Sequence, residues 1–160
     1  MSDAKNQYQR VARAFTKILD NRNRDPVEYE DDAWAFFLNC WHLKDWIKND
    51  LEGVAKATRE KIEVEVHSYP ALVMVGDLAN RSKHLKVTRG SIKADVNRRR
   101  QGTTSGTAYI DGKAGNQKAD KAHPEIVLLV INNKGDEIPV RKLATDAMKN
   151  WMAIIKKYRI

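Results

Sequence analysis

Two stripes of apolar side chains between Ala33 and Ile47 constrain the fold of this chain more than any other feature. The first stripe contains Trp34, Phe37, Leu38 and Trp41, and the second contains Phe36, Cys40, Leu43 and Ile47. Their spacing of three and four residues is typical of an α-helix. A helix that is apolar on two sides lies at the centre of a bundle or buries one side against a second molecule. This segment is therefore predicted to be the core of a helical domain or its dimer interface.

Four further segments have the periodicity of amphipathic helices. We expect them at residues 3–20, 51–66, 70–83 and 143–158. The central helix should begin at Pro26, with Asp25 as its N-cap. Asn49-Asp50 is the expected cap of the helix that follows. The end of that helix, Ile62 to His67, alternates with period two, so a short strand is an open alternative there.

The second half of the chain contains the strand signals. Glu125–Ile131 is a continuous apolar run, and residues 137–140 are expected to pair back with it, with Pro139 confining that strand to an edge. The composition of residues 101–122 predicts a long loop or a loose hairpin. We predict a single α+β domain: a bundle of four to five helices over residues 1–90, a small antiparallel sheet inserted over residues 91–142, and a closing helix over residues 143–160.

Positive charge is concentrated in the second half of the chain. The formal net charge is +8, of which residues 1–80 contribute 11 − 14 = −3 and residues 81–160 contribute 18 − 7 = +11. This asymmetry predicts a phosphate-binding face. An exposed basic loop that binds nothing in particular is the alternative. The candidate nucleic-acid-binding residues are Lys83, Lys86, Arg89, Lys93, Arg98, Arg99 and Arg100.

A polar stripe interrupts the apolar pattern of the fourth helix. Asp77, Arg81 and His84 are spaced i, i+4 and i+7, so one helical face carries all three. His84 is the candidate general acid–base group, and Asn80 is placed one turn before it to fix its tautomer. His42 and Asp45 form a second pair on the central helix. We predict that His42 and His84 meet in one polar pocket; a buried structural network is the alternative for all six residues.

Other chemistry has weaker support in the sequence. Only His42, Asp45, Asp77 and His84 could converge on a metal ion, and they lack a tight ligand spacing, so neither a metal nor another cofactor is expected. Cys40 lies in an apolar run and is expected in the core. A single cysteine excludes an internal disulfide and favours a reducing cytoplasm. No apolar run approaches the length of a membrane span, and the polar N-terminus does not look like a signal peptide.

The two motifs Trp41-His42-Leu43-Lys44-Asp45-Trp46 and Asp77-Leu78-Ala79-Asn80-Arg81-Ser82-Lys83-His84 resemble a pattern in small uncharacterised bacterial proteins. More distantly, they are similar to the HEPN superfamily of helical RNA- and nucleotide-associated domains. The resemblance covers residues 1–90 and 143–160. It implies a bundle of four or five helices, frequent dimers, and RNA cleavage by an arginine and a histidine. Here these are Arg81 and His84, with two residues between them, whereas the family motif has four to six.

Three functions are compatible with these features. The first is a HEPN-like protein that binds RNA or nucleotide phosphates or cleaves RNA without a metal, as a homodimer in which each protomer supplies half of the site. The second is a non-enzymatic interaction protein, such as an antitoxin or a defence-system accessory, whose polar stripe is structural. The third is a basic nucleic-acid-binding domain without catalysis.

Overall fold

The computed structural model describes residues 3–20, 24–50, 55–83, 95–102, 125–132 and 134–160 of the 160-residue chain. The described residues form five helices and three strands. In chain order these are α1 (Asp3–Leu19), α2 (Pro26–Asn49), α3 (Lys56–Ser68), α4 (Pro70–Lys83), β1 (Asp95–Gly102), β2 (Glu125–Ile131), β3 (Glu137–Pro139) and α5 (Val140–Tyr158). The prediction of a mainly helical α+β fold, with a small antiparallel sheet before the last helix, is confirmed.

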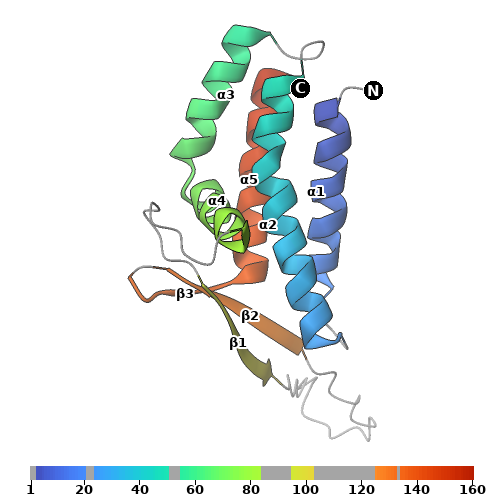
Figure 1. Ribbon diagram of the computed structural model, residues 1–160, viewed down its shortest axis with the longest axis vertical. Helices are drawn as coiled ribbons and strands as arrows, with labels where there is room; N and C mark the ends of the chain where they lie inside the picture. Colours follow the sequence, from blue (N-terminus) through green and yellow to red (C-terminus); the bar gives the residue numbers. More distant parts are fainter. Residues whose placement is uncertain (1–2, 21–23, 51–54, 84–94, 103–124, 133) are drawn as a thin grey trace, which may run out of the picture.

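The helices are arranged around α2. Figure 1 shows α1, α2 and α5 side by side along the long axis, with α3 leaning beside them and α4 crossing between this bundle and the sheet. α2 contacts the other four helices and β2. Phe36, Phe37 and Cys40 are fully buried on it. The second apolar stripe of α2 is buried throughout, whereas Trp34, Leu38 and Trp41 of the first stripe are half-buried. The contacts of α2 with the other helices confirm its central place in the bundle, and burial of its first stripe against a second molecule stays a prediction.

The start of α2 follows the predicted capping. The Asp25 carboxylate accepts hydrogen bonds from the backbone N–H groups of Val27 at 2.8 Å and Glu28 at 3.1 Å. Pro26 occupies the first turn, where its missing N–H leaves no donor unpaired. The Tyr29 hydroxyl donates to the Ile18 carbonyl at 2.9 Å and connects α2 to the end of α1.

The predicted cap of the third helix, Asn49-Asp50, is wrong. α3 begins at Lys56 after Ala55, which provides no side-chain cap, and residues 51–54 lie outside the described part. Asp50 is buried, and its carboxylate accepts a hydrogen bond from the Ala4 N–H at 3.2 Å. The first N–H groups of a helix have no partner within it and favour a negative charge. Asp50 therefore accepts a hydrogen bond from the N-terminal turn of α1 and is not the N-cap of α3.

The open alternative at residues 62–67 is decided in favour of a helix. Ile62 and Val66, one turn apart, are buried, whereas Val64 between them is 74% exposed. The exposed valine explains why the apolar pattern looked like an alternating strand. No helix in the described ranges is long and apolar enough to cross a membrane.

The sheet has the order β1-β2-β3, with both pairs antiparallel. Leu128 and Val130 on the central strand are buried, and β2 contacts α5 and α2. Pro139 lies at the end of edge strand β3, as predicted, and the chain then continues directly into α5. The strand β1 falls within the basic segment, which the sequence did not identify as a strand.

Candidate functional site

The His42–Asp45 pair forms as its i, i+3 spacing predicted. His42 Nδ1 lies 3.3 Å from Asp45 Oδ2, and Lys44 Nζ donates to Asp45 Oδ1 at 2.9 Å. The side chains of His42 and Asp45 are 34% and 43% exposed, so the pair faces solvent in part. Burial acts to raise the pKa of Asp45, but the hydrogen bonds from Lys44 and His42 outweigh it and lower that pKa. Asp45 is therefore an ionised acceptor shared by two donors.

Trp41 connects this pair to α3. The Lys44 ammonium lies 4.8 Å from the centroid of the Trp41 ring, a cation–π contact. The His67 ring packs edge-on at 5.6 Å between centroids, and His67 Nδ1 lies 2.8 Å from the Glu63 carbonyl. His67 is not among the site residues predicted from the sequence. Its distance from Trp41 along the chain explains this, because the contact depends on how α3 packs on α2.

α4 approaches α2 closely at Gly76. A Cβ atom built on Gly76 would lie 2.7 Å from carbon atoms of the Trp41 ring. The helices that carry the two sequence motifs are therefore neighbours, as the two-helix site requires. His84 lies outside the described residues, so its approach to His42 stays a prediction.

Asp77, Asn80 and Arg81 differ in their environments on α4. Asp77 is half-buried, and its Oδ2 atom is buried without a hydrogen-bond partner among the described residues. Burial raises the pKa of this carboxyl group. Asn80 is exposed and Arg81 is half-buried. A carboxylate oxygen without a donor is unfavourable in a folded domain, which makes Asp77 the residue of this helix that most needs an explanation.

The predicted basic residues lie partly within the described part. Arg98, Arg99 and Arg100 are consecutive on β1, and Lys83 ends α4. The register pairs Arg98 with Leu128 and Gln101 with Ile126, so an irregularity falls at the two arginines between them. Lys86, Arg89 and Lys93 are outside the described residues. The structure thus places three of the seven candidates together on an edge strand.

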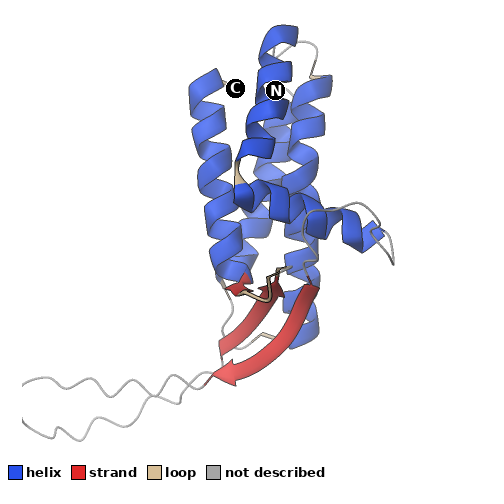
Figure 2. Ribbon diagram, turned by 90° about the vertical axis from the view of Figure 1, so that its left-hand side faces the viewer, coloured by secondary structure: helices blue, strands red, loops and turns tan. Residues whose placement is uncertain are grey.

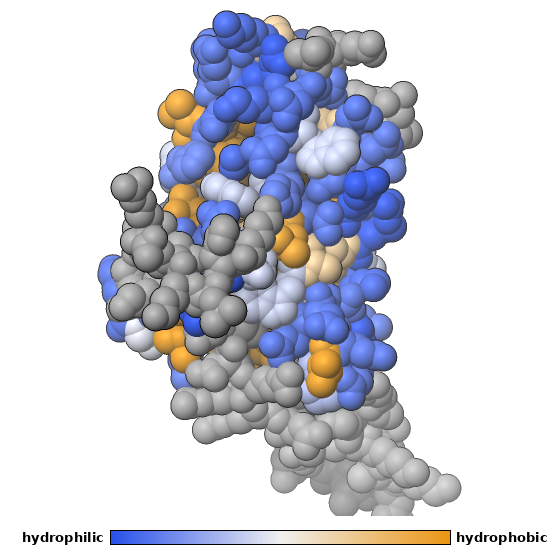
Figure 3. Space-filling view, in the orientation of Figure 1, coloured by the Kyte–Doolittle hydropathy of each residue, from blue (hydrophilic) through white to orange (hydrophobic). Residues whose placement is uncertain are grey.

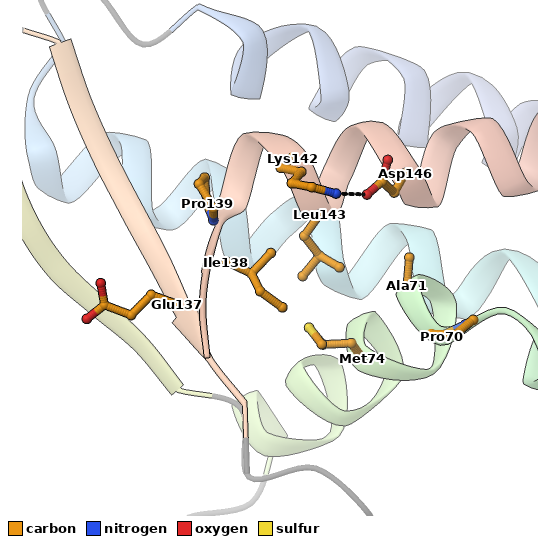
Figure 4. Close-up of a pocket in the computed structure, with 9 residues that line it drawn as sticks. All are labelled: Pro70, Ala71, Met74, Glu137, Ile138, Pro139, Lys142, Leu143 and Asp146. Atoms are coloured by element: carbon orange, nitrogen blue, oxygen red, sulfur yellow. Dashed lines mark hydrogen bonds and ion pairs between the residues drawn. The ribbon is translucent and has the colours of Figure 1, made fainter. Parts of the chain in front are cut away.

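A small cavity of about 280 Å³ lies between α4, β3 and α5, away from these residues (Figure 4). Its lining is mostly apolar, and the ion pair between Lys142 and Asp146, 2.6 Å long, lies beside it. The lining residues are Pro70, Ala71, Met74, Glu137, Ile138, Pro139, Lys142, Leu143 and Asp146. None of the predicted site residues takes part.

The described residues also bear on two other kinds of site, a metal site and a reactive cysteine. No three His, Cys, Asp or Glu side chains among the described residues lie close enough to hold a metal ion. Cys40 is fully buried, as predicted, and burial raises the pKa of its thiol to about 12. A thiolate nucleophile is therefore excluded at this position.

On the face in Figure 3 the described surface is mainly hydrophilic, with small and separate hydrophobic areas.

No family model, no curated protein and no solved structure matches this chain. The similarity to the HEPN superfamily accordingly stays a prediction from the two motifs.

Proposed function

We propose that this chain binds RNA through the basic segment that includes β1. The observation that carries the proposal is the position of Arg98, Arg99 and Arg100 on an edge strand of the sheet. Among the described strands β1 has a neighbour on one side only, and the backbone groups on the other side of an edge strand can face a ligand. Arginine suits phosphate because its planar guanidinium can donate two parallel hydrogen bonds to it.

The charge distribution supports the same function. The net charge of +11 over residues 81–160 contrasts with −3 over residues 1–80. A surface with an excess of one sign raises the local concentration of an oppositely charged partner and speeds association. Contacts of this kind position a nucleic acid and do not read its sequence. Binding without sequence preference is therefore expected.

Charged residues on an edge strand have a second use, because they discourage pairing between the edges of two sheets. The two uses predict different results. Arginines that only protect the edge would leave polyanion binding unchanged when they are replaced, while the protein would associate or aggregate more readily.

Replacing Arg98, Arg99 and Arg100 together by alanine tests the proposal. The plot of log affinity against log salt should become flatter by roughly 2–3 units, since each phosphate contact contributes about 0.7–0.9. Fluorescence anisotropy with a labelled single-stranded RNA between about 50 and 200 mM salt measures this slope. The control is the triple change of Arg13, Lys56 and Lys61, three exposed cations on α1 and α3, to alanine. An equal change in the control would contradict a site at β1.

Metal-independent RNA cleavage is a second candidate function, favoured by the Asp77 oxygen that has no hydrogen-bond partner among the described residues, on the helix that carries Arg81. Functional sites tolerate unfavourable groups that the fold alone would not retain. For this function Arg81 would stabilise phosphate charge and His84 would exchange protons with the RNA 2′-hydroxyl, with Asp77 on the same helical face to tune His84. A non-enzymatic role of the same residues predicts no cleavage by the wild-type chain.

Asp77→Asn separates these readings by its effect on stability and its pH dependence. The raised pKa of Asp77 in the folded chain means that folding favours its protonated form. That contribution is complete below the unfolded pKa of about 3.9 and is lost as the pH rises through the folded pKa. At pH 7 the substitution should therefore raise the melting temperature, by about 2–4 °C for a gain of about 1 kcal/mol.

The gain should shrink toward zero as the pH approaches about 4. Thermal unfolding followed by circular dichroism between pH 4 and pH 8 gives this profile, and RNA cleavage is assayed on the same preparations. A more stable variant without cleavage, compared with an active wild type, identifies Asp77 as functional. A variant that melts at a lower temperature at pH 7 would mean that the carboxylate is stabilised by its surroundings.

A further inference from the structure

The exposed face of α5 carries a row of three lysines that the proposed β1 site does not include. Lys142, Lys149 and Lys156 are spaced seven residues apart, and all three are exposed. Residues seven apart on an α-helix lie on the same face and about 10 Å apart along its axis. The lysines thus form a nearly straight row roughly 21 Å long. We call it the lysine row.

The charges of this helix are unbalanced. α5 carries five cations and one acid, since its sequence VRKLATDAMKNWMAIIKKY contains Asp146 as the only carboxylate side chain. Asp146 pairs with Lys142 at 2.6 Å, and Lys157 pairs with Glu65 of α3, also at 2.6 Å. Lys149 and Lys156 form no ion pair with any described residue. Within the described part of the chain, two of the three lysines in the row therefore have no carboxylate to neutralise them.

The surface between Lys149 and Lys156 is exposed. Ala153 and Met152 are both exposed, and Met152 is 57% exposed. Small and flexible side chains at these positions leave the ammonium groups free to approach a partner together. The opposite face of α5, with Leu143, Trp151 and Ile154, is buried in the core.

That burial disfavours a membrane surface as the partner. A helix that binds in a lipid interface inserts its apolar face there, with the lysines toward the headgroups. In α5 the apolar face is already used by the core, so only the charged row is available. A regularly spaced row of point charges fits a polymer of regularly spaced anions, which is the chemistry of a nucleic-acid backbone.

The lysine row begins next to the sheet that contains β1. α5 follows directly after β3, and β3 lies two strand spacings, about 10 Å, from β1 in the sheet. In Figure 2, α5 is the outer helix that rises from the sheet to the C-terminus. Lys142, in the first turn of α5, is thus the member of the row closest to the sheet.

We propose that the lysine row on α5 binds the phosphates of a nucleic-acid strand and extends the site at β1. This inference rests on the proposed function and adds a second contact surface to it. Because lysine acts on phosphate as a point charge, the row should contribute affinity without sequence preference.

The test replaces Lys149 and Lys156 together by glutamine in the full chain and measures binding of a labelled 20-nucleotide single-stranded RNA by anisotropy. Two lost contacts flatten the salt slope by about 1.4 units, which corresponds to roughly 25-fold weaker binding at about 0.1 M salt if the intercept at 1 M is unchanged. The matched control is Lys56→Gln with Lys61→Gln, which removes the same charge from the exposed surface of α3. The control should retain the wild-type slope, and both variants should melt at the wild-type temperature.

Three results would overturn the inference. The first is wild-type binding by the α5 variant together with loss of binding by the β1 triple variant, which leaves the proposed function intact. The second is an equal loss in the α3 control, which reduces the effect to net charge. The third is weaker binding of the α5 variant to phosphatidylserine vesicles but not to RNA, which assigns the row to a lipid surface. If the wild-type chain itself does not bind the RNA at about 50 mM salt, both proposals fail together.

Discussion

Replacing Trp151 by alanine is expected to lower the free energy of unfolding by about 3–5 kcal/mol, the usual cost of removing a large aromatic side chain from a core. For a domain of this size, that loss lowers the melting temperature by about 6–20 °C. Trp151 is fully buried on α5, and its Nε1–H donates to the carbonyl of Cys40 on α2 at 3.2 Å. The substitution removes both the ring and a direct connection between these two helices.

Two further variants separate these contributions. Trp151→Phe retains an aromatic ring but loses the N–H, so its cost should be lower, about 1–2 kcal/mol. Met152→Ala changes the adjacent, exposed residue and should alter stability by no more than about 0.5 kcal/mol. Urea unfolding followed by circular dichroism measures all three. A loss below about 1 kcal/mol for Trp151→Ala would mean that the site collapses around the cavity and that α5 is not held at this point.

The parts of the fold that the sequence predicts correctly depend on local patterns. The two apolar stripes of α2 specify a helix at the centre of the bundle, and the Asp25-Pro26 pair specifies where it begins. The continuous apolar run of β2 identifies a buried strand. Each of these signals lies within a few residues of the structure that it predicts, so no tertiary contact is needed to interpret it.

The parts that the sequence does not predict depend on contacts between distant segments. Asp50 looks like the cap of the next helix, but it lies 46 residues along the chain from Ala4, the residue whose N–H it accepts. β1 contains three arginines and one apolar residue, so its strand structure comes from pairing with β2 and not from its own pattern. Within the candidate site, the His42–Asp45 pair is local and was predicted. The contact of His67 with Trp41 joins two helices and was not.

Gly76→Ala is expected to destabilise the chain by about 1–3 kcal/mol, although alanine is the better helix former. In an exposed helix this change would be favourable by about 1 kcal/mol. Here the new methyl group would lie 2.7 Å from the Trp41 ring, which neighbouring α2 and the His67 ring hold in place. Overpacking of this kind forces a shift of the backbone or of the ring, and the cost of that shift exceeds the gain in helix propensity.

The effect of Gly76→Ala on stability should change sign when the Trp41 ring is removed. The three atoms nearest to the new methyl group are all carbons of that ring. In a Trp41→Leu background, Gly76→Ala should be neutral or stabilising, by up to about 1 kcal/mol. Urea unfolding of the four chains of this double-mutant cycle gives the coupling between the two positions. If Gly76→Ala destabilises the chain equally in the wild-type and Trp41→Leu backgrounds, the contact with the Trp41 ring is not the cause. The close approach of α4 to α2 would then not explain the glycine.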